Sequence, residues 1–240
     1  MTNQDYNLNQ YQTGTIPKTE AVAVSKTFLL NVYNWMTMGL AITGLIAYAV
    51  STVITEEFIA RNIFLFYGLL IFQLLIVIGL SFAINKIPAI VAIGAFFFYS
   101  AITGLTFSLL FFVYTSASIA STFFICAAMF GSVSVFGYIT KMDLSKIGAF
   151  AFMGLIGLII ASVVNMFLRN EMLYWIISYV GVLIFVGLTA WDTQKIKRLA
   201  QSIDGKSEAG KKAAIMGALN LYLDFINMFL FLLRIMGSRR

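Results

Sequence analysis

Seven long apolar runs, separated by short polar breaks, follow one another after residue 25. A helix needs about 20 apolar residues to cross roughly 30 Å of hydrocarbon, and each run is long enough to do so. Because only helices and closed barrels satisfy their backbone in lipid, we predict an all-α membrane protein with seven transmembrane helices. The predicted spans are Phe28–Val53, Ile63–Ile84, Ala89–Val113, Ser118–Ile139, Ile147–Leu168, Met172–Ala200 and Ala214–Met236.

The boundary between the third and fourth runs, Tyr114-Thr115-Ser116, contains no charge. The fused stretch from Ala89 to Ile139 is far too long for one span, so we predict two. Residues 1–25 are rich in Asn, Gln, Tyr and Thr and have too few apolar side chains to fold alone. We therefore expect a flexible polar tail over 1–25 and one seven-helix transmembrane domain over 26–240. The tail lacks the charged and apolar regions of a cleavable secretion signal.

Composition narrows the function. Only 11% of the residues are charged and 60% are hydrophobic, so lipid is the expected surrounding and partner. The absence of histidine excludes imidazole general bases and histidine-ligated metal sites, and we expect no cofactor. Cys126 lies in an apolar run and is interpreted as a packed thiol. The net charge of +6 comes from basic residues between the apolar runs, so nucleic acid is not an expected partner.

The distribution of lysine and arginine predicts the orientation. Most of the 16 basic residues fall on the side of the N-terminus, including Lys86, Lys141 and the basic residues that follow the sixth run. Basic residues favour the cytoplasmic side, so we expect a cytoplasmic N-terminus and an external C-terminus.

Two acidic residues, Asp192 and Asp224, lie inside the last two runs. A charge at membrane depth costs at least about 2.5 kcal/mol, so such residues are functional candidates. In an antiparallel hairpin, residues equidistant from the loop lie at the same depth. Glu208, near the centre of the polar stretch between the two runs, is midway between the aspartates. We therefore predict a facing pair. The other acids fall in tails or loops and are interpreted as solvated charges.

Further polar residues accompany this pair. Asn220, Asp224 and Asn227 recur at i, i+4 and i+7, which places them on one face of the seventh helix. The two asparagines either bond neighbouring helices or line a pathway. Lys195 and Lys197 either extend to the cytoplasmic surface or line a vestibule that leads to the aspartates.

Two carboxylates in one site of low dielectric constant cannot easily both ionise, so the pair is expected to share a proton. Loss of that proton leaves two repelling anions. These can separate the helices or transiently bind a hard cation such as calcium through oxygen ligands. One site thus combines a pH sensor, a gate and a metal contact formed by Asp192 and Asp224.

Four segments resemble the Bax inhibitor-1 family, also called the transmembrane Bax inhibitor motif family. The C-terminal segment is long enough to be specific, and Trp191 stands where the family more often has tyrosine. The segments are Leu221–Asn227 with Leu232–Arg234, Gly187–Lys197, Gly137–Ser145 and Phe28–Tyr33.

The resemblance implies a central seventh helix surrounded by the other six, and a pH-sensitive calcium leak sensed by an aspartate pair, here Asp192 and Asp224. It also implies a basic latch after the second helix, where Lys86 stands in place of arginine. The family often has an acid in the second helix, whereas this chain has Gln73. The short tail is similar to that of bacterial members, which predicts the bacterial inner membrane.

Three functions remain in view. The first is a calcium leak channel or cation transporter, and the second, also implied by the resemblance, is a regulatory membrane protein that acts through protein partners. The third is an intramembrane aspartyl protease. Those proteases resemble one another in a Gly-x-Gly-Asp motif, whereas Tyr222 stands two residues before Asp224. We therefore do not expect an enzyme.

Overall fold

The computed structural model describes the backbone of residues 18–240 and the side chains from residue 27 onward. Helices make up almost all of this part, which contains no β-strand, and seven segments are long and apolar enough to cross a membrane. The predicted fold class is therefore confirmed. The helices are α1 (Lys18–Ser51), α2 (Glu56–Arg61), α3 (Ile63–Ala83), α4 (Ala89–Phe107), α5 (Leu110–Val113), α6 (Ser116–Ile139), α7 (Ser145–Leu168), α8 (Glu171–Ala200) and α9 (Glu208–Met236).

Two helices begin well before the predicted spans. α1 starts at Lys18 rather than Phe28, because the preceding residues include Ala, Glu and Lys, which are good helix formers outside hydrocarbon as well. α9 starts at Glu208 rather than Ala214, where the Ser207 hydroxyl caps the helix by accepting from the Gly210 N–H. Residues 1–17 of the predicted tail lie outside the described residues.

The third span is interrupted near its end. α4 stops at Phe107 and α5 continues to Val113, although the two together form one candidate span. The hydroxyls of Thr106 and Ser108 donate to carbonyls three residues earlier, and such local bonds compete with regular helix. The Thr115 hydroxyl then accepts from the Ser118 N–H and caps α6. The uncharged boundary between the third and fourth spans is thus real.

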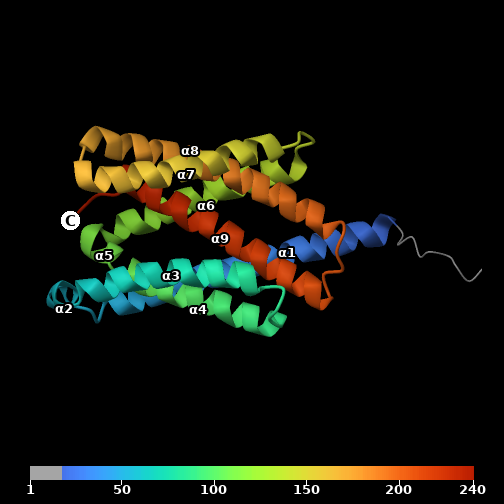
Figure 1. Cartoon of the computed structure of the whole chain (residues 1–240), viewed down its shortest axis with the longest axis horizontal. Helices are drawn as coiled ribbons and strands as arrows, with labels where there is room; N and C mark the ends of the chain where they lie inside the picture. Colours follow the sequence, from blue (N-terminus) through green and yellow to red (C-terminus); the bar gives the residue numbers. More distant parts are fainter. Residues whose placement is uncertain (1–17) are drawn as a thin grey trace, which may run out of the picture.

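The spans form two groups of three helices with α9 between them (Figure 1). One group contains α1, α3 and α4, and the other contains α6, α7 and α8. α9 packs against α1, α4, α6 and α8, whereas α3 packs on α4 and α7 packs on α8. In the most apolar 18-residue stretch of α9, 72% of the residues are buried inside the bundle, whereas in that of α3 only 11% are. That all six other spans surround the seventh stays a prediction.

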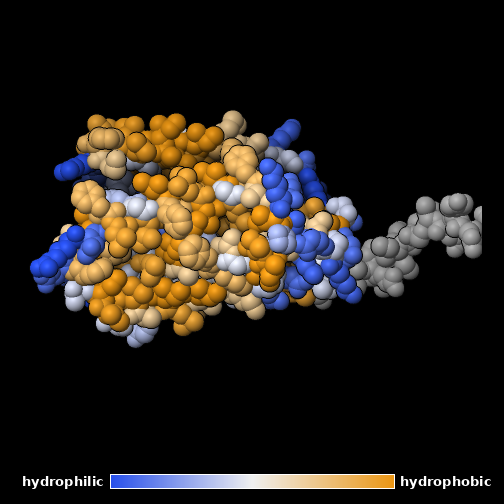
Figure 2. All heavy atoms as spheres, turned by 60° about the horizontal axis from the view of Figure 1, so that its bottom comes forward, coloured by the Kyte–Doolittle hydropathy of each residue, from blue (hydrophilic) through white to orange (hydrophobic). Residues whose placement is uncertain are grey.

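The outer surface of the bundle is apolar. Large side chains such as Phe64, Phe82 and Phe150 are almost fully exposed on the outward faces of α3 and α7. Figure 2 shows a broad hydrophobic belt with hydrophilic residues gathered at the two ends. A surface of this kind is stable in a bilayer and not in water, so the chain is a multi-pass integral membrane protein.

Two glycines bring α8 into direct contact with its neighbours. A Cβ atom on Gly137 of α6 would overlap the Ala190 carbonyl oxygen, and one on Gly148 of α7 would overlap the Trp191 ring. Small residues of this kind allow helix backbones to approach in lipid. The segment of α8 directly before Asp192 is therefore held from both sides.

Candidate functional site

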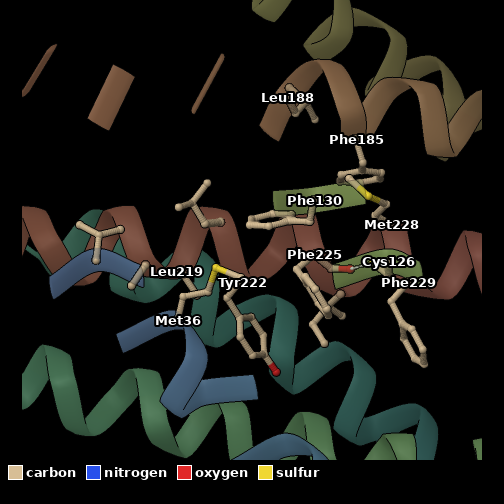
Figure 3. Packing of buried hydrophobic residues seen from close by; sticks show 14 of the residues in the cluster. Met36, Cys126, Phe130, Phe185, Leu188, Leu219, Tyr222, Phe225, Met228 and Phe229 are labelled. Atoms are coloured by element: carbon tan, nitrogen blue, oxygen red, sulfur yellow. Dashed lines mark hydrogen bonds between the residues drawn. The ribbon is translucent and has the colours of Figure 1, made fainter. Parts of the chain in front are cut away.

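The register between α8 and α9 is set by two contacts. The rings of Phe185 and Phe231 stack with centroids 6.0 Å apart, and the Ile196 side chain packs on Gly217. Asp192 lies between the two contact positions on α8, and Asp224 lies between them on α9. The antiparallel register that the residue count predicted is therefore present. Figure 3 shows Phe185 and Leu188 of α8 on one side of α9.

Both aspartates are buried between the helices. Asp192 is 7% exposed and Asp224 is 5% exposed. The two carboxylates interact electrostatically across the α8–α9 interface. Oδ1 of Asp192 and Oδ2 of Asp224 have no hydrogen-bond partner. The structure thus brings together the two acids that the sequence singled out.

Two hydroxyl groups near the aspartates are also buried without a hydrogen-bond partner. They are the Thr189 hydroxyl of α8 and the Ser134 hydroxyl of α6. The Thr189 hydroxyl lies near the Asp224 carboxylate, although no hydrogen bond of normal geometry joins the two groups. Buried polar atoms are normally paired, and unpaired ones mark strain or a functional site. The unpartnered oxygens among the described residues are confined to α6, α8 and α9, which pack on one another.

The two lysines after Asp192 lie at aromatic rings. Lys195 is exposed, acts electrostatically on Asp192, and places its ammonium 5.1 Å from the Trp191 ring centre. The Lys197 ammonium donates to the Tyr138 carbonyl oxygen and lies 4.9 Å from the centre of the Tyr138 ring. Such cation–π contacts stabilise a cation at a surface. A vestibule lined by these lysines stays a prediction.

No hydrogen bond joins the remaining sequence candidates to the two carboxylates in the described part of the chain. The Asn227 side chain donates to the Leu223 carbonyl oxygen at 2.8 Å, so its amide nitrogen bonds its own helix. Asn220 is half-buried on α9. Lys86 is exposed in the connection between α3 and α4, and its latch role stays a prediction. Gln73 is bonded to Thr103 and Thr106 of α4, away from α8.

Sequence reasoning missed two buried polar residues close to the aspartates. Gln194 donates to the Met142 carbonyl oxygen at 2.7 Å and accepts from the Leu144 N–H at 3.0 Å, which fastens the α6–α7 connection to α8. The Tyr222 hydroxyl lies 2.6 Å from the Thr43 hydroxyl of α1. Tyr222 and Asp224 are two positions apart, so they point to different sides of α9. Both missed residues were uncharged polar groups inside apolar runs.

The acids interpreted as solvated charges include three that are exposed and also have a partner. Asp143 pairs with Arg198 at 2.6 Å, Glu57 pairs with Arg61 at 2.6 Å, and Glu208 accepts a hydrogen bond from the Ala89 N–H. The hydrogen bonds from Arg198 and Ser145 lower the pKa of Asp143 to about 2. Loop acids at helix ends thus find cations and orphan backbone donors once the chain is folded.

Comparison with known proteins gives a consistent picture. A family model described as "Inhibitor of apoptosis-promoting Bax1" matches residues 25–240. The chain is 51% identical to the inner membrane protein YbhL of Escherichia coli K12, over 90% of this chain and 93% of that protein. It is 43% identical to an uncharacterized protein of Borreliella burgdorferi, over 92% and 96% of the two chains. An uncharacterized membrane protein of Streptococcus pyogenes is 36% identical, over 88% and 92%.

Proposed function

The chain belongs to the Bax inhibitor-1 family, and from this premise we propose that it is a pH-sensitive calcium leak channel gated by Asp192 and Asp224. The observation that supports this proposal is the pair of buried, interacting carboxylates with unpartnered oxygens. Two such groups without a paired cation are costly when both are ionised, and a shared proton removes their repulsion.

The gate is the contact between α8 and α9. With one proton on the pair, a carboxylic acid and a carboxylate can hydrogen-bond and hold the helices together. Without it, two anions repel and favour separation of α9 from α8. Because α8 is held by Gly137 and Gly148, the movement falls on α9 and its contacts with the other group of helices.

Calcium is the proposed permeating ion because the site offers only oxygen atoms. Calcium binds six to eight oxygen ligands. The carboxylates of Asp192 and Asp224 and the hydroxyls of Thr189 and Ser134 are the unpartnered oxygens on the neighbouring helices. Two carboxylates are few for a storage site, and the described residues contain no group of three or more His, Cys, Asp or Glu side chains. A transient contact during passage fits this ligand set.

The proposed location is the bacterial inner membrane, with the N-terminus in the cytoplasm. The relative from Escherichia coli is named an inner membrane protein, and α1 begins at the lysine-rich end of the bundle. Basic residues favour the cytoplasmic side. We propose no enzymatic activity for this chain.

The test is calcium efflux from liposomes at several pH values. We expect Asp192→Asn and Asp224→Asn to remove most of the pH dependence, because an amide cannot titrate. Asp204→Asn is the matched control, since Asp204 is an exposed acid in the α8–α9 connection. A flux whose pH dependence survives both substitutions would show that the pair is not the gate. Cleavage of peptides by the purified protein, lost in both variants, would instead favour an aspartyl protease.

A further inference from the structure

A cavity of about 800 Å³ lies at the end of the bundle opposite the lysine-rich connections. It is formed by the end of α7, the start of α8 and the end of α9, near the C-terminus in Figure 1. The proposed function makes no use of it. Asp224 and Arg234, which lines the cavity, are ten residues apart on α9, or about 15 Å along the axis.

Positive charge collects in this cavity. Arg169, Arg234 and Arg239 line it, and Glu171 is the acid that lines it with them. The two ion pairs of the described residues, Arg61–Glu57 and Arg198–Asp143, lie elsewhere and neutralise none of these three arginines. Like charges gathered in one cavity repel one another, so an anion that binds between them relieves the repulsion.

Tyr174 holds two of the arginines. Nη2 of Arg239 donates to the Tyr174 hydroxyl at 3.2 Å, while the Arg234 guanidinium lies 5.8 Å from the Tyr174 ring centre and 5.3 Å from that of Phe231. The Arg239 backbone is further fixed by a bridge to Tyr114. The guanidinium groups of Arg234 and Arg239 are therefore positioned before any ligand arrives, which lowers the entropy cost of binding.

Arg169 has an unusual backbone. It ends α7 with φ of 50°, and it is the one non-glycine residue with positive φ in the described part of the chain. This left-handed conformation costs an ordinary side chain free energy that asparagine or glycine would mostly avoid. The Arg169 side chain nevertheless lines the cavity, which gives this costly position a use.

The choice of arginine over lysine indicates the ligand. Every basic residue at this end is arginine, whereas all but Arg198 at the opposite end are lysine. Lysine would serve solubility or topology equally well. Arginine differs in its planar fork of donors, which binds phosphate through two parallel hydrogen bonds and stacks on aromatic rings.

We propose that the cavity lined by Arg169, Arg234 and Arg239 binds a phosphate group. The side chains of Asn165, Asn170 and Ser162, which also line it, add neutral hydrogen-bonding groups for the remaining oxygens. The phosphate belongs either to the headgroup of an anionic phospholipid or to a soluble phosphate, and the two sources share the same recognition chemistry.

The experiment uses the full-length protein in maltoside micelles, which contain no phosphate. One arm titrates inorganic phosphate by calorimetry, and the other adds phosphatidylglycerol and counts bound lipid by native mass spectrometry. We expect wild type to bind at least one of the two probes with one site. The double variant Arg234→Gln/Arg239→Gln should bind that probe at least about tenfold more weakly. Binding of inorganic phosphate without binding of phosphatidylglycerol identifies a soluble phosphate as the ligand. Binding of phosphatidylglycerol identifies a lipid headgroup.

The matched control is Arg61→Gln, which removes an arginine at the same end but outside the cavity. It should bind like wild type. Tyr174→Phe, which keeps the ring but loses the hydroxyl that holds Arg239, should show an intermediate loss and serves if the double variant does not fold. The proposal is overturned if wild type binds neither probe, if the Arg234 and Arg239 changes leave binding intact, or if Arg61→Gln weakens it equally.

Discussion

The phenol oxygen of Tyr222 lies 2.6 Å from Oγ1 of Thr43, and this contact joins α9 to α1 inside the bundle. The Thr43 hydroxyl also lies 2.9 Å from the Ser100 carbonyl oxygen, so α4 shares the contact. The Tyr222 ring packs edge-on against Phe96 and Tyr99 of α4. One side chain on α9 therefore binds one group of helices, while Asp224 two residues later meets the other group.

Tyr222→Phe should destabilise the protein by about 1 kcal/mol, because it removes one hydrogen bond while Thr43 keeps carbonyl partners on Gly39 and Ser100. Tyr222→Ala should cost about 3–5 kcal/mol, since it also leaves a cavity in the core. Denaturant unfolding in micelles, followed by circular dichroism, measures both. Equal losses in the two variants would show that the hydroxyl, and not the ring, carries the stability.

Gly137→Ala should destabilise the contact between α6 and α8. The added Cβ would overlap the Ala190 carbonyl oxygen, and the backbone has to shift at a cost of about 1–3 kcal/mol. Gly131→Ala on the same helix is the control, because nothing lies within 4 Å of its Cβ and alanine favours helix. The melting temperature should therefore fall in Gly137→Ala, and it should rise or stay the same in Gly131→Ala.

Asp224→Asn should raise the melting temperature by a few degrees at pH 9, which corresponds to a gain of about 1 kcal/mol in the free energy of unfolding. The amide removes an ionised group that is buried beside another carboxylate and has an unpartnered oxygen. The gain should shrink at pH 5 as the wild-type pair takes up protons. Asp204→Asn, in an exposed loop, should show neither effect. A variant that is less stable than wild type at every pH would contradict the picture of a strained pair.

Asp143→Asn should lower the melting temperature slightly at neutral pH, because it breaks the exposed pair with Arg198. The folded pKa of Asp143 is about 2, below the ordinary value of about 3.9. A depressed pKa contributes stability that is complete above about pH 4 and is lost as the pH falls through 2. Melting curves of wild type and variant should therefore converge near pH 2. A constant gap down to that pH would rule out the assigned hydrogen bonds.

The number of spans followed from the sequence because hydrocarbon thickness sets it whatever the packing. The grouping of the spans did not, since apolar residues suit lipid and protein equally. Phe64 and Phe96 lie in neighbouring spans, yet Phe64 is 85% exposed and Phe96 is fully buried. The extension of α1 and α9 beyond the apolar runs was missed because helix outside the membrane needs no apolar sequence.

The aspartates were found because a charge in an apolar run is rare, and their register followed from counting residues along a hairpin. The hydroxyls were not found, because serine in a membrane helix usually bonds a carbonyl of its own turn. Ser132 does so with Ala128 at 2.8 Å, whereas Ser134 is unpartnered. The two residues look alike in sequence. The arginines of the cavity were interpreted only as topology signals, since their gathering around one cavity depends on how α7, α8 and α9 pack.

The position of α9 between two groups of helices makes its tolerance to mutation very different from that of α3. α3 packs mainly on α4 and otherwise faces lipid, so any apolar residue of suitable length can occupy most of its positions. α9 has to match the shapes of four neighbours at once. If each helix is randomised with apolar residues, most α3 variants should therefore stay functional and most α9 variants should not. Sequence differences among relatives should be more frequent in α3 than in α9.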